Sequence, residues 1–237
     1  MAKDQQNKQD KPEKKAPPAG QGGGKPKGAP KGGGGHEPRT DAPEDLGPKT
    51  PPRLRVKYQT EVREAMAKEF GTGNPMALPR LEKIVLNVNM GRHLEGAKIP
   101  PQVKDTVIET LRTVSGQKPV VVKAKKSVSN FKVREGVDSS AMVTIRRERM
   151  WHFLDRLINL ATPRIKDFRG LNDKAFDKDG NYAMGLTEQG VFPEIDMAKA
   201  VFTHGMNINF VFSNSTPAKS RFLLEQLGMP FRKPEKR

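Results

Sequence analysis

Four oxygen-bearing side chains have the spacing of a calcium-binding loop, with Asp177, Asp179, Asn181 and Glu188 at its first, third, fifth and twelfth positions. Carboxylate and amide oxygens are the ligands that Ca²⁺ prefers, but such a loop needs glycine at its sixth position to make a sharp turn. That position holds Tyr182, and the order Asp179-Gly180-Asn181 is typical of a β-hairpin turn. We therefore expect a plain turn here and no metal site.

The other residues that could do chemistry lack suitable partners. The chain has no cysteine, which excludes disulfides, thiolate zinc sites and cysteine nucleophiles. Ser127 and Ser129 lie among lysines without a recognisable base, and Gly24-Lys25 lacks the upstream glycine of a phosphate-binding loop. None of the four histidines has a metal-binding spacing to another, so each is expected at the surface or partly packed: His36, His93, His152 and His204. The sequence thus predicts neither an enzyme nor a cofactor.

The charge of the chain favours a polyanionic partner. The formal net charge is +16, and residues 1–50, with ten basic and seven acidic residues, contribute only +3 of it. Each phosphate that such a protein neutralises releases counterions, which favours association with nucleic acid. The stretch from Lys123 to Gly136 is rich in basic residues and lacks a sustained hydrophobic period, so we expect a basic loop there. The open alternative is that the charge only keeps the protein soluble.

Hydrophobic periodicity predicts both helices and strands. Alternation of apolar residues and β-branched runs predict strands at residues 81–90, 119–122, 139–147 and 206–212. Apolar residues at helical spacing predict helices at residues 53–70, 100–114, 150–161 and 217–227. The first three are followed by a residue that ends a helix, namely Gly71, Gly116 and Pro163. The last has Thr216 as its expected N-cap and is followed by Gly228.

The interspersed helices and strands favour an α+β fold with a mostly antiparallel sheet, helices packed on one face and a protruding basic loop. The other face of the sheet would then be free. In the strand at 81–90, Ile84, Leu86 and Val88 share one side, while Asn87 and Asn89 share the other. We therefore expect amide side chains on the free face.

Residues 1–50 differ in composition from the remainder. They contain no aromatic residue but hold ten of the 22 glycines and eight of the 20 prolines. Such a segment has too little apolar surface to offset the entropy lost on ordering. We expect a disordered Lys/Gly/Pro-rich extension at 1–50, one folded domain at 51–233 and a short basic tail at 234–237. No apolar run approaches the roughly 18–20 residues that cross a membrane, so we expect a cytoplasmic protein without a membrane partner.

Short motifs follow one another along the predicted domain: Pro79-Arg80-Leu81-Glu82-Lys83-Ile84-Val85-Leu86-Asn87, Ser115-Gly116-Gln117-Lys118-Pro119, Ala124-Lys125-Lys126-Ser127, Phe131-Lys132, Glu148-Arg149-Met150, Pro163-Arg164-Ile165, Asp167-Phe168-Arg169-Gly170-Leu171, Phe192-Pro193-Glu194-Ile195-Asp196 and Met229-Pro230-Phe231-Arg232. Together they resemble the bacterial large-subunit ribosomal protein five family, the universal 5S-rRNA-binding ribosomal proteins. Any one motif alone would be modest, but their collinear order covers most of the domain.

The resemblance implies a non-enzymatic protein on the large ribosomal subunit. It implies binding to 5S rRNA in the central protuberance, beside 23S rRNA and neighbouring proteins, and a bridge to a small-subunit head protein. In that family one face of the sheet is the 5S rRNA platform, and the matching residues here are Lys83, Asn87, Gln117, Lys118 and Thr144. Asn87 and Thr144 each stand between apolar residues that face the core side of their strands, so both can point away from the core. There they can form hydrogen bonds with phosphate or ribose. The alternative is that these are ordinary polar residues of a solvated face.

The basic loop corresponds to the family's contact with peptidyl-site tRNA, and the matching residues are Lys125, Lys126, Ser127, Lys132 and Arg134. The cationic side chains can follow a phosphate backbone. Phe131 offers either an anchor into the core or a surface on which a base stacks. We favour the anchor, because a lone aromatic residue in a long loop more often packs.

The chain departs from the family pattern at several places. Ser129-Asn130 stand where the family usually has Ala-Gly, and Val137-Asp138-Ser139 stand where it usually has Pro-Ile-Gly. Arg147 occupies a position where glycine is common, and its side chain adds a phosphate contact or is simply solvated. Residues 197–203 match poorly, and residues 1–50 have no counterpart. A free RNA-binding regulator or chaperone with the ribosomal fold is the alternative function. An enzyme acting on RNA would need a carboxylate or histidine cluster.

Overall fold

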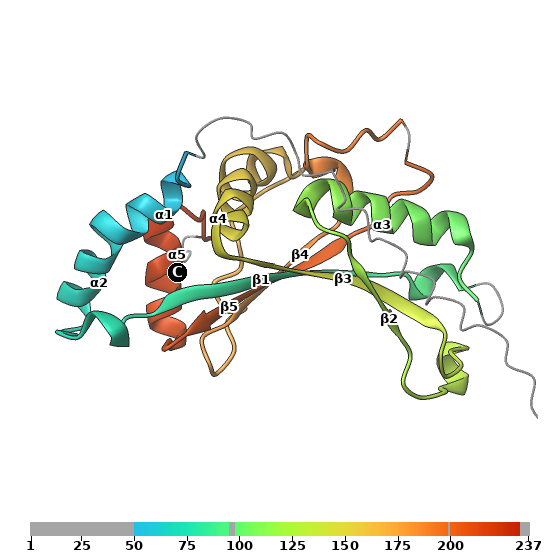
Figure 1. Ribbon diagram of the computed structural model, residues 1–237, viewed down its shortest axis with the longest axis horizontal. Coiled ribbons are helices and arrows are strands. Elements are labelled where there is room, and N and C mark those ends of the chain that lie inside the picture. Colours follow the sequence, from blue (N-terminus) through green and yellow to red (C-terminus); the bar gives the residue numbers. More distant parts are fainter. Residues whose placement is uncertain (1–49, 95–97, 199, 233–237) are drawn as a thin grey trace, which may run out of the picture. The chain divides into compact units, whose positions relative to one another are not determined.

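Five strands form one antiparallel sheet in the described residues, in the order β2-β3-β1-β5-β4. In this computed structural model the described residues are 50–94, 98–198 and 200–232. The strand bounds are β1 (Arg80–Asn89), β2 (Val120–Lys123), β3 (Asp138–Arg146), β4 (Tyr182–Leu186) and β5 (Met206–Ser213). The longest strand, β1, is central and pairs with β3 on one side and β5 on the other (Figure 1). The predicted α+β fold with an antiparallel sheet is confirmed.

Helices cover one face of this sheet. Figure 1 places α3 (Pro101–Ser115) and α4 (Arg147–Arg156) on the same side of the strands. Two short helices, α1 (Arg53–Lys57) and α2 (Arg63–Glu69), pack with α4 and α5 (Pro217–Leu227) at one end. Two π-helical segments are η1 (Tyr58–Val62) and η5 (Leu157–Ala161), and the short 3-10 helices are η2 (Pro75–Ala77), η3 (Gly91–His93), η4 (Ser129–Phe131), η6 (Thr162–Arg164) and η7 (Gln189–Val191).

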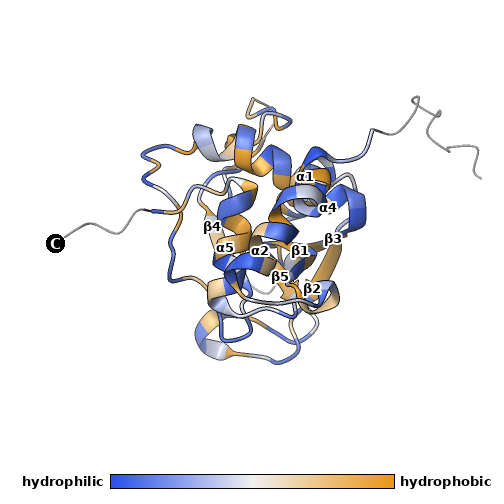
Figure 2. Cartoon of the chain, turned by 90° about the vertical axis from the view of Figure 1, so that its left-hand side faces the viewer, coloured by the Kyte–Doolittle hydropathy of each residue, from blue (hydrophilic) through white to orange (hydrophobic). Residues whose placement is uncertain are grey.

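The core lies between the helices and the covered face of the sheet. Ile84, Leu86 and Val88 of β1 are fully buried, as their alternation predicts. They meet buried residues of neighbouring strands and of the helices, among them Ile145, Phe210, Leu111, Leu154 and Leu223. Figure 2 shows hydrophobic residues concentrated where the helices meet the strands. Packing on one face leaves the other face of the sheet available for polar residues.

Most predicted element boundaries agree with the structure, and the exceptions have local causes. The helix at 53–70 forms but contains the π-helical turn η1. Helix α4 begins at Arg147 rather than Met150, because Arg147 turns the chain directly from β3 into the helix and the first turn is polar. Thr216 stands at the N-cap of α5, but its side chain makes no capping hydrogen bond. Gly116 and Gly228 end their helices at φ values of 65° and 100°, as expected for glycine.

The expected turn at Asp179-Gly180-Asn181 is confirmed. The Asn181 backbone N–H donates to Asp177 Oδ1 at 2.6 Å, and the Asp177 N–H donates to the Asn181 carbonyl at 2.9 Å. No group of three potential metal ligands occurs among the described residues. Within the same residues, no helix combines the length and apolar character needed to cross a membrane. The predictions for 1–50 and 234–237 fall, apart from Thr50, on segments outside the described residues.

Candidate nucleic-acid interface

Polar residues of neighbouring strands form rows on the sheet face that the helices leave open. Asn87 of β1 lies opposite Met142 of β3 and Asn207 of β5. In the adjacent row, Thr144 lies opposite Val85, which is itself opposite Asn209. These positions alternate with buried ones along each strand, so their side chains point away from the core. We call this surface the open face, and the predicted residues Asn87 and Thr144 both lie on it.

A β-bulge adds cationic residues to the open face. The pairing of β1 with β5 shifts between Leu81 and Lys83. The extra residue allows Arg80 and Lys83, three positions apart, to face the same side. Arg80 Nε donates to Ser213 Oγ at 3.0 Å, while Lys83 lies opposite Arg146 of β3. The structure therefore places Lys83 on the open face together with Arg80 and Arg146, two cations that were not among the residues predicted from the sequence.

Gln117 and Lys118 lie beside the same end of the sheet, in the connection between α3 and β2. Ser115 Oγ donates to the Leu111 carbonyl at 2.5 Å and accepts from the Gln117 N–H at 3.2 Å. These bonds and the left-handed Gly116 fix the direction in which the chain leaves the helix. Gln117 is partly exposed and Lys118 is exposed. Both therefore lie where they could extend the open face at its β2 edge.

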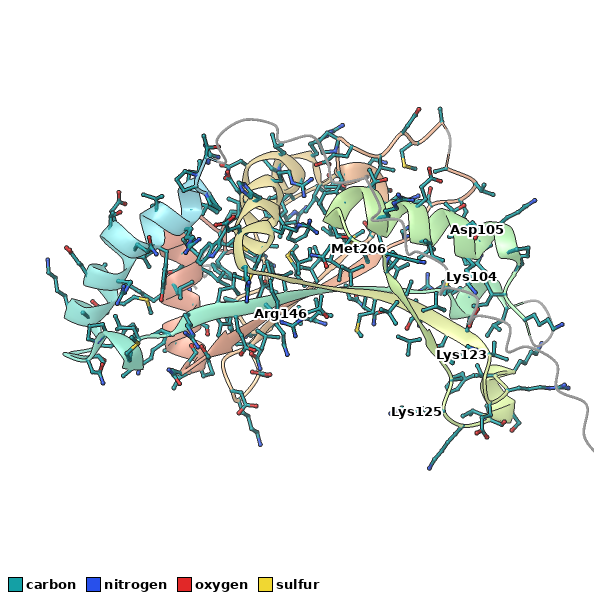
Figure 3. The ribbon with its side chains drawn as sticks, viewed as in Figure 1. Lys104, Asp105, Lys123, Lys125, Arg146 and Met206 are labelled. Carbon is teal, nitrogen blue, oxygen red and sulfur yellow. The ribbon has the colours of Figure 1, made fainter. Side chains whose placement is uncertain are left out.

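The basic loop is a closed hairpin that protrudes from the sheet (Figure 1). Val128 and Val133 exchange backbone hydrogen bonds of 2.9 and 3.2 Å, and the Ala124 N–H donates to the Val137 carbonyl at 2.8 Å. Ser127 Oγ accepts from the Glu135 N–H at 2.9 Å, so this predicted contact residue supports the loop itself. Figure 3 shows Lys123 and Lys125 on this hairpin, away from the helices. The other predicted cations, Lys126, Lys132 and Arg134, are also exposed.

The expectation that Phe131 anchors the loop in the core is wrong. Its side chain is 74% exposed. The physical reason is that the hairpin closes through its own backbone hydrogen bonds, so its tip extends beyond the sheet and cannot reach the core. The loop therefore presents an aromatic ring to solvent among exposed lysines.

The segment Val137-Asp138-Ser139, where the sequence differs from the expected family pattern, has a structural role. Asp138 begins β3, and its Oδ2 accepts a hydrogen bond of 2.7 Å from Lys104 Nζ of α3. This partly buried pair joins the base of the loop to a helix on the covered side. An aspartate here thus links the strand to the helix layer.

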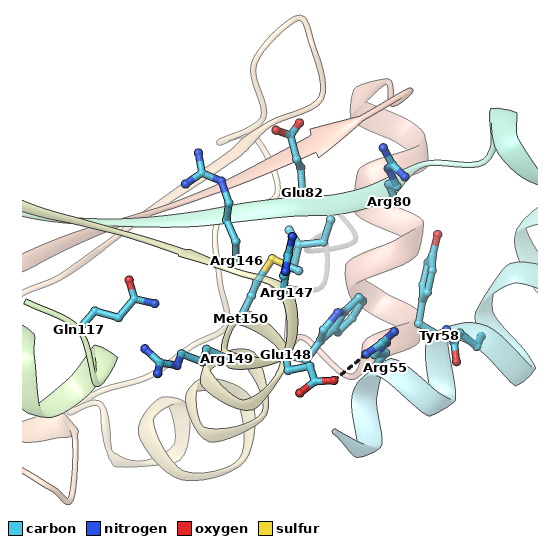
Figure 4. Close-up of a pocket in the computed structure, with 13 residues that line it drawn as sticks. Arg55, Tyr58, Arg80, Glu82, Gln117, Arg146, Arg147, Glu148, Arg149 and Met150 are labelled. Carbon is cyan, nitrogen blue, oxygen red and sulfur yellow. Dashed lines mark hydrogen bonds and ion pairs between the residues drawn. The ribbon is translucent and has the colours of Figure 1, made fainter. Parts of the chain in front are cut away.

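A pocket of about 1020 Å³ lies where β1 and β3 approach the start of α4 (Figure 4). Five arginines and two glutamates are among its thirteen lining residues: Arg55, Arg80, Arg146, Arg147, Arg149, Glu82 and Glu148. Arg55 pairs with Glu148 at 3.1 Å, and Arg149 Nη1 lies 3.4 Å from the Gly116 carbonyl. We call this site the arginine pocket. The run Arg146-Arg147-Glu148-Arg149 could have indicated it from the sequence.

His204 departs from the expectation of a surface or partly packed residue. It is only 7% exposed, and its backbone N–H donates to Oε1 of the fully buried Gln189. Burial lowers the pKa of His204, an effect that a hydrogen bond to the Gly205 carbonyl opposes and the nearby His93 reinforces. Its Nε2 is buried without a hydrogen-bond partner in the described residues. His204 is therefore a neutral packing residue at neutral pH.

Comparison with known proteins identifies similar sequences over the same region. Residues 74–134 match a family model described as ribosomal protein L5, and residues 138–231 match one that describes the C-terminus of the same ribosomal family. The large ribosomal subunit protein uL5 of Anaeromyxobacter sp. (strain Fw109-5) is 48% identical over 180 residues, covering 76% of this chain and 98% of that protein. The uL5 proteins of Geobacter sulfurreducens and Bdellovibrio bacteriovorus are 47% and 48% identical, covering 76% of this chain and 98% and 99% of theirs.

Proposed function

Because the chain belongs to the ribosomal protein L5 family and is a structural, non-enzymatic constituent of the large ribosomal subunit, we propose that its open face binds 5S rRNA. In bacteria this subunit is cytoplasmic. The observation that carries the proposal is the set of rows in which Asn87, Thr144 and Lys83 share one uncovered sheet face. Gln117 and Lys118 extend the proposed contact at the β2 edge.

The chemistry of the open face suits structured RNA. Helical RNA presents ribose hydroxyls and phosphates over a broad, shallow groove, so proteins recognise it mainly by shape and backbone contacts. Amide and hydroxyl groups such as Asn87, Asn207 and Thr144 can donate to phosphate and exchange hydrogen bonds with the 2′-hydroxyl. Lys83 and Arg146 supply positive charge at one end of the rows. This combination favours RNA over a neutral protein partner.

Filter binding across a salt series tests this function. The full chain should bind 5S rRNA more tightly than an unrelated structured RNA of similar length. Replacing Asn87 and Thr144 together by Ala should weaken 5S rRNA binding more than replacing Lys25 and Lys27 together by Ala. Equal affinity for both RNAs would refute specific recognition, and equal effects of the two double variants would mean that bulk charge alone drives binding.

The basic loop is the proposed contact with peptidyl-site tRNA. The loop that carries the exposed ring of Phe131 also carries four exposed cations, Lys125, Lys126, Lys132 and Arg134. Proteins that hold irregular or single-stranded RNA combine backbone-tracking charges with aromatic rings on which bases stack. With the anchor role excluded by its exposure, Phe131 is proposed to stack against tRNA, and Ser127 is proposed to hold the hairpin in shape.

The remaining proposed partners are 23S rRNA, neighbouring proteins of the central protuberance and a small-subunit head protein. These proposals rest on family membership. A cryo-EM map of ribosomes containing this chain tests them directly, since each partner should bury a distinct surface. A map in which the chain lies away from 5S rRNA would overturn the central proposal as well.

A further inference from the structure

We propose that the arginine pocket binds phosphate groups of the RNA that occupies the open face, and that Arg147 contributes a phosphate contact there. This inference rests on the proposed function and assigns a second contact region to it. It involves residues outside the predicted 5S rRNA set, apart from Gln117. It also decides between the two roles left open for Arg147, a phosphate contact or a solvated charge.

The composition of the pocket favours an anion. Its five arginines and two glutamates leave a net charge of +3 on the lining. One glutamate, Glu148, is already engaged by Arg55. Guanidinium groups bind phosphate through paired N–H donors in a fixed plane, which makes arginine better suited than lysine to bidentate contacts. The described residues give Arg146 and Arg147 no hydrogen-bond or ion-pair partner of their own.

The pocket is continuous with the open face. Arg146 is both a lining residue and the cross-strand neighbour of Lys83. Arg80 lines the pocket and is oriented by its bond to Ser213 of β5. Figure 4 shows Arg146 rising beside β1 on the same side as Glu82, with Gln117 at the opposite wall. The pocket therefore adjoins the end of the open face where Lys83 and Arg146 lie, within reach of an RNA backbone bound to that face.

Arg147 has an unfavourable backbone conformation. Its φ is +55°, a left-handed value that is unfavourable for most residues and is adopted most readily by glycine, asparagine and aspartate. Glycine would adopt it without strain. Among the described residues the guanidinium of Arg147 has no hydrogen bond or ion pair that would offset this strain. A contact outside the chain accounts for an arginine here, and the surrounding positive charge makes that contact an anion.

An acidic protein segment is the competing occupant. RNA is favoured because the pocket shares Arg146 and Gln117 with the surface proposed to bind RNA. A separate protein site would have to adjoin that surface without overlapping it. Poly-glutamate serves as the probe for the protein alternative.

The test uses the full chain with Arg147→Gly, which removes the charge and relieves the backbone strain together. The matched control is Arg112→Gln, which removes one charge from the exposed side of α3, the helix on the covered side of the sheet. Filter binding to 5S rRNA is measured from low to moderate salt, with thermal unfolding of each variant. We expect Arg147→Gly to weaken binding about fivefold and to lower the salt slope by about 0.7–1, while its melting temperature stays equal or rises.

Each outcome decides the proposal. If Arg147→Gly and Arg112→Gln change affinity and salt slope equally, Arg147 is a solvated charge and the proposal is wrong. Loss of poly-glutamate binding with unchanged RNA binding would also overturn it. If the wild-type chain does not distinguish 5S rRNA from unrelated RNA, the proposed function fails. The phosphate site still stands in that case if Arg147→Gly weakens binding to both RNAs.

Discussion

Lys83 of β1 lies directly opposite Arg146 of β3 on the open face. Like charges in directly opposed positions of an antiparallel pair destabilise the sheet. The bulge between Leu81 and Lys83 brings Arg80 to the same side of β1. The free protein therefore holds positive charge together at the end of its longest strand, where a phosphate group would relieve the repulsion.

Replacing Lys83 by Gln should act in opposite directions on stability and on RNA binding. Removing one of two opposed charges should raise the free energy of unfolding by about 0.3 kcal/mol. The same change should weaken 5S rRNA binding and lower the salt slope by about 0.7–1. Urea denaturation and filter binding measure the two effects. Lys68→Gln, at an exposed position of α2, is the control and should leave RNA binding unchanged. A loss of stability in Lys83→Gln would contradict the repulsion.

Replacing Phe131 by Ala should leave stability unchanged and weaken the contact with tRNA. The ring is 74% exposed, so its removal leaves no cavity. Stacking of one base on an aromatic ring contributes about 1–3 kcal/mol, so we expect about tenfold weaker binding of tRNA to the loop. Thermal unfolding and tRNA binding to ribosomes carrying the variant measure the two effects. A stability loss like the roughly 3–5 kcal/mol expected for Phe210→Ala in the core would restore the anchor role.

Two glycine substitutions should differ strongly in their effects on stability. Gly116 and Gly170 both have positive φ, at 65° and 97°. A Cβ on Gly116 would meet no atom within 4 Å, whereas one on Gly170 would lie 2.8 Å from the backbone of Arg232. Gly116→Ala should therefore lower the free energy of unfolding by about 1 kcal/mol through strain alone. Gly170→Ala adds a backbone clash and should lower it by about 3 kcal/mol. Equal losses in urea denaturation would show that the chain near Arg232 moves aside freely.

The stability of the domain should decrease as the pH falls below the ordinary pKa of histidine. Burial lowers the pKa of His204, so the unfolded chain binds a proton at a pH where the folded chain does not. The contribution of neutral His204 is fully present above the unfolded pKa of about 6.5 and is lost as the pH falls through the lower folded value. Urea denaturation at pH 7.5 and pH 5.5 measures the effect. His204→Gln should show a smaller loss between the two conditions, and an identical loss would assign the pH dependence to other groups.

Local patterns predicted the elements because they depend on residues close together in the chain. The alternation in β1 identified both its core side and its amide side, and Gly116 and Gly228 marked helix ends through a backbone conformation that glycine adopts without strain. The start of α4 was missed because its first turn is polar and carries no hydrophobic period. The resemblance to the family predicted Lys83, Asn87 and Thr144 as site residues, and the structure puts all three on one face of the sheet.

Composition, periodicity and collinear motifs were sufficient to predict a basic α+β protein of a ribosomal family, because all three are read directly from the order of the residues. The three-dimensional fold was needed to show that Lys83 opposes Arg146 and that arginines from β1, β3 and two helices line one pocket. It was also needed to show that the side chain of Phe131 is exposed to solvent. Strand register, the bulge and the closure of the hairpin are set by contacts between residues far apart in the chain. No local pattern encodes which distant residues will become neighbours.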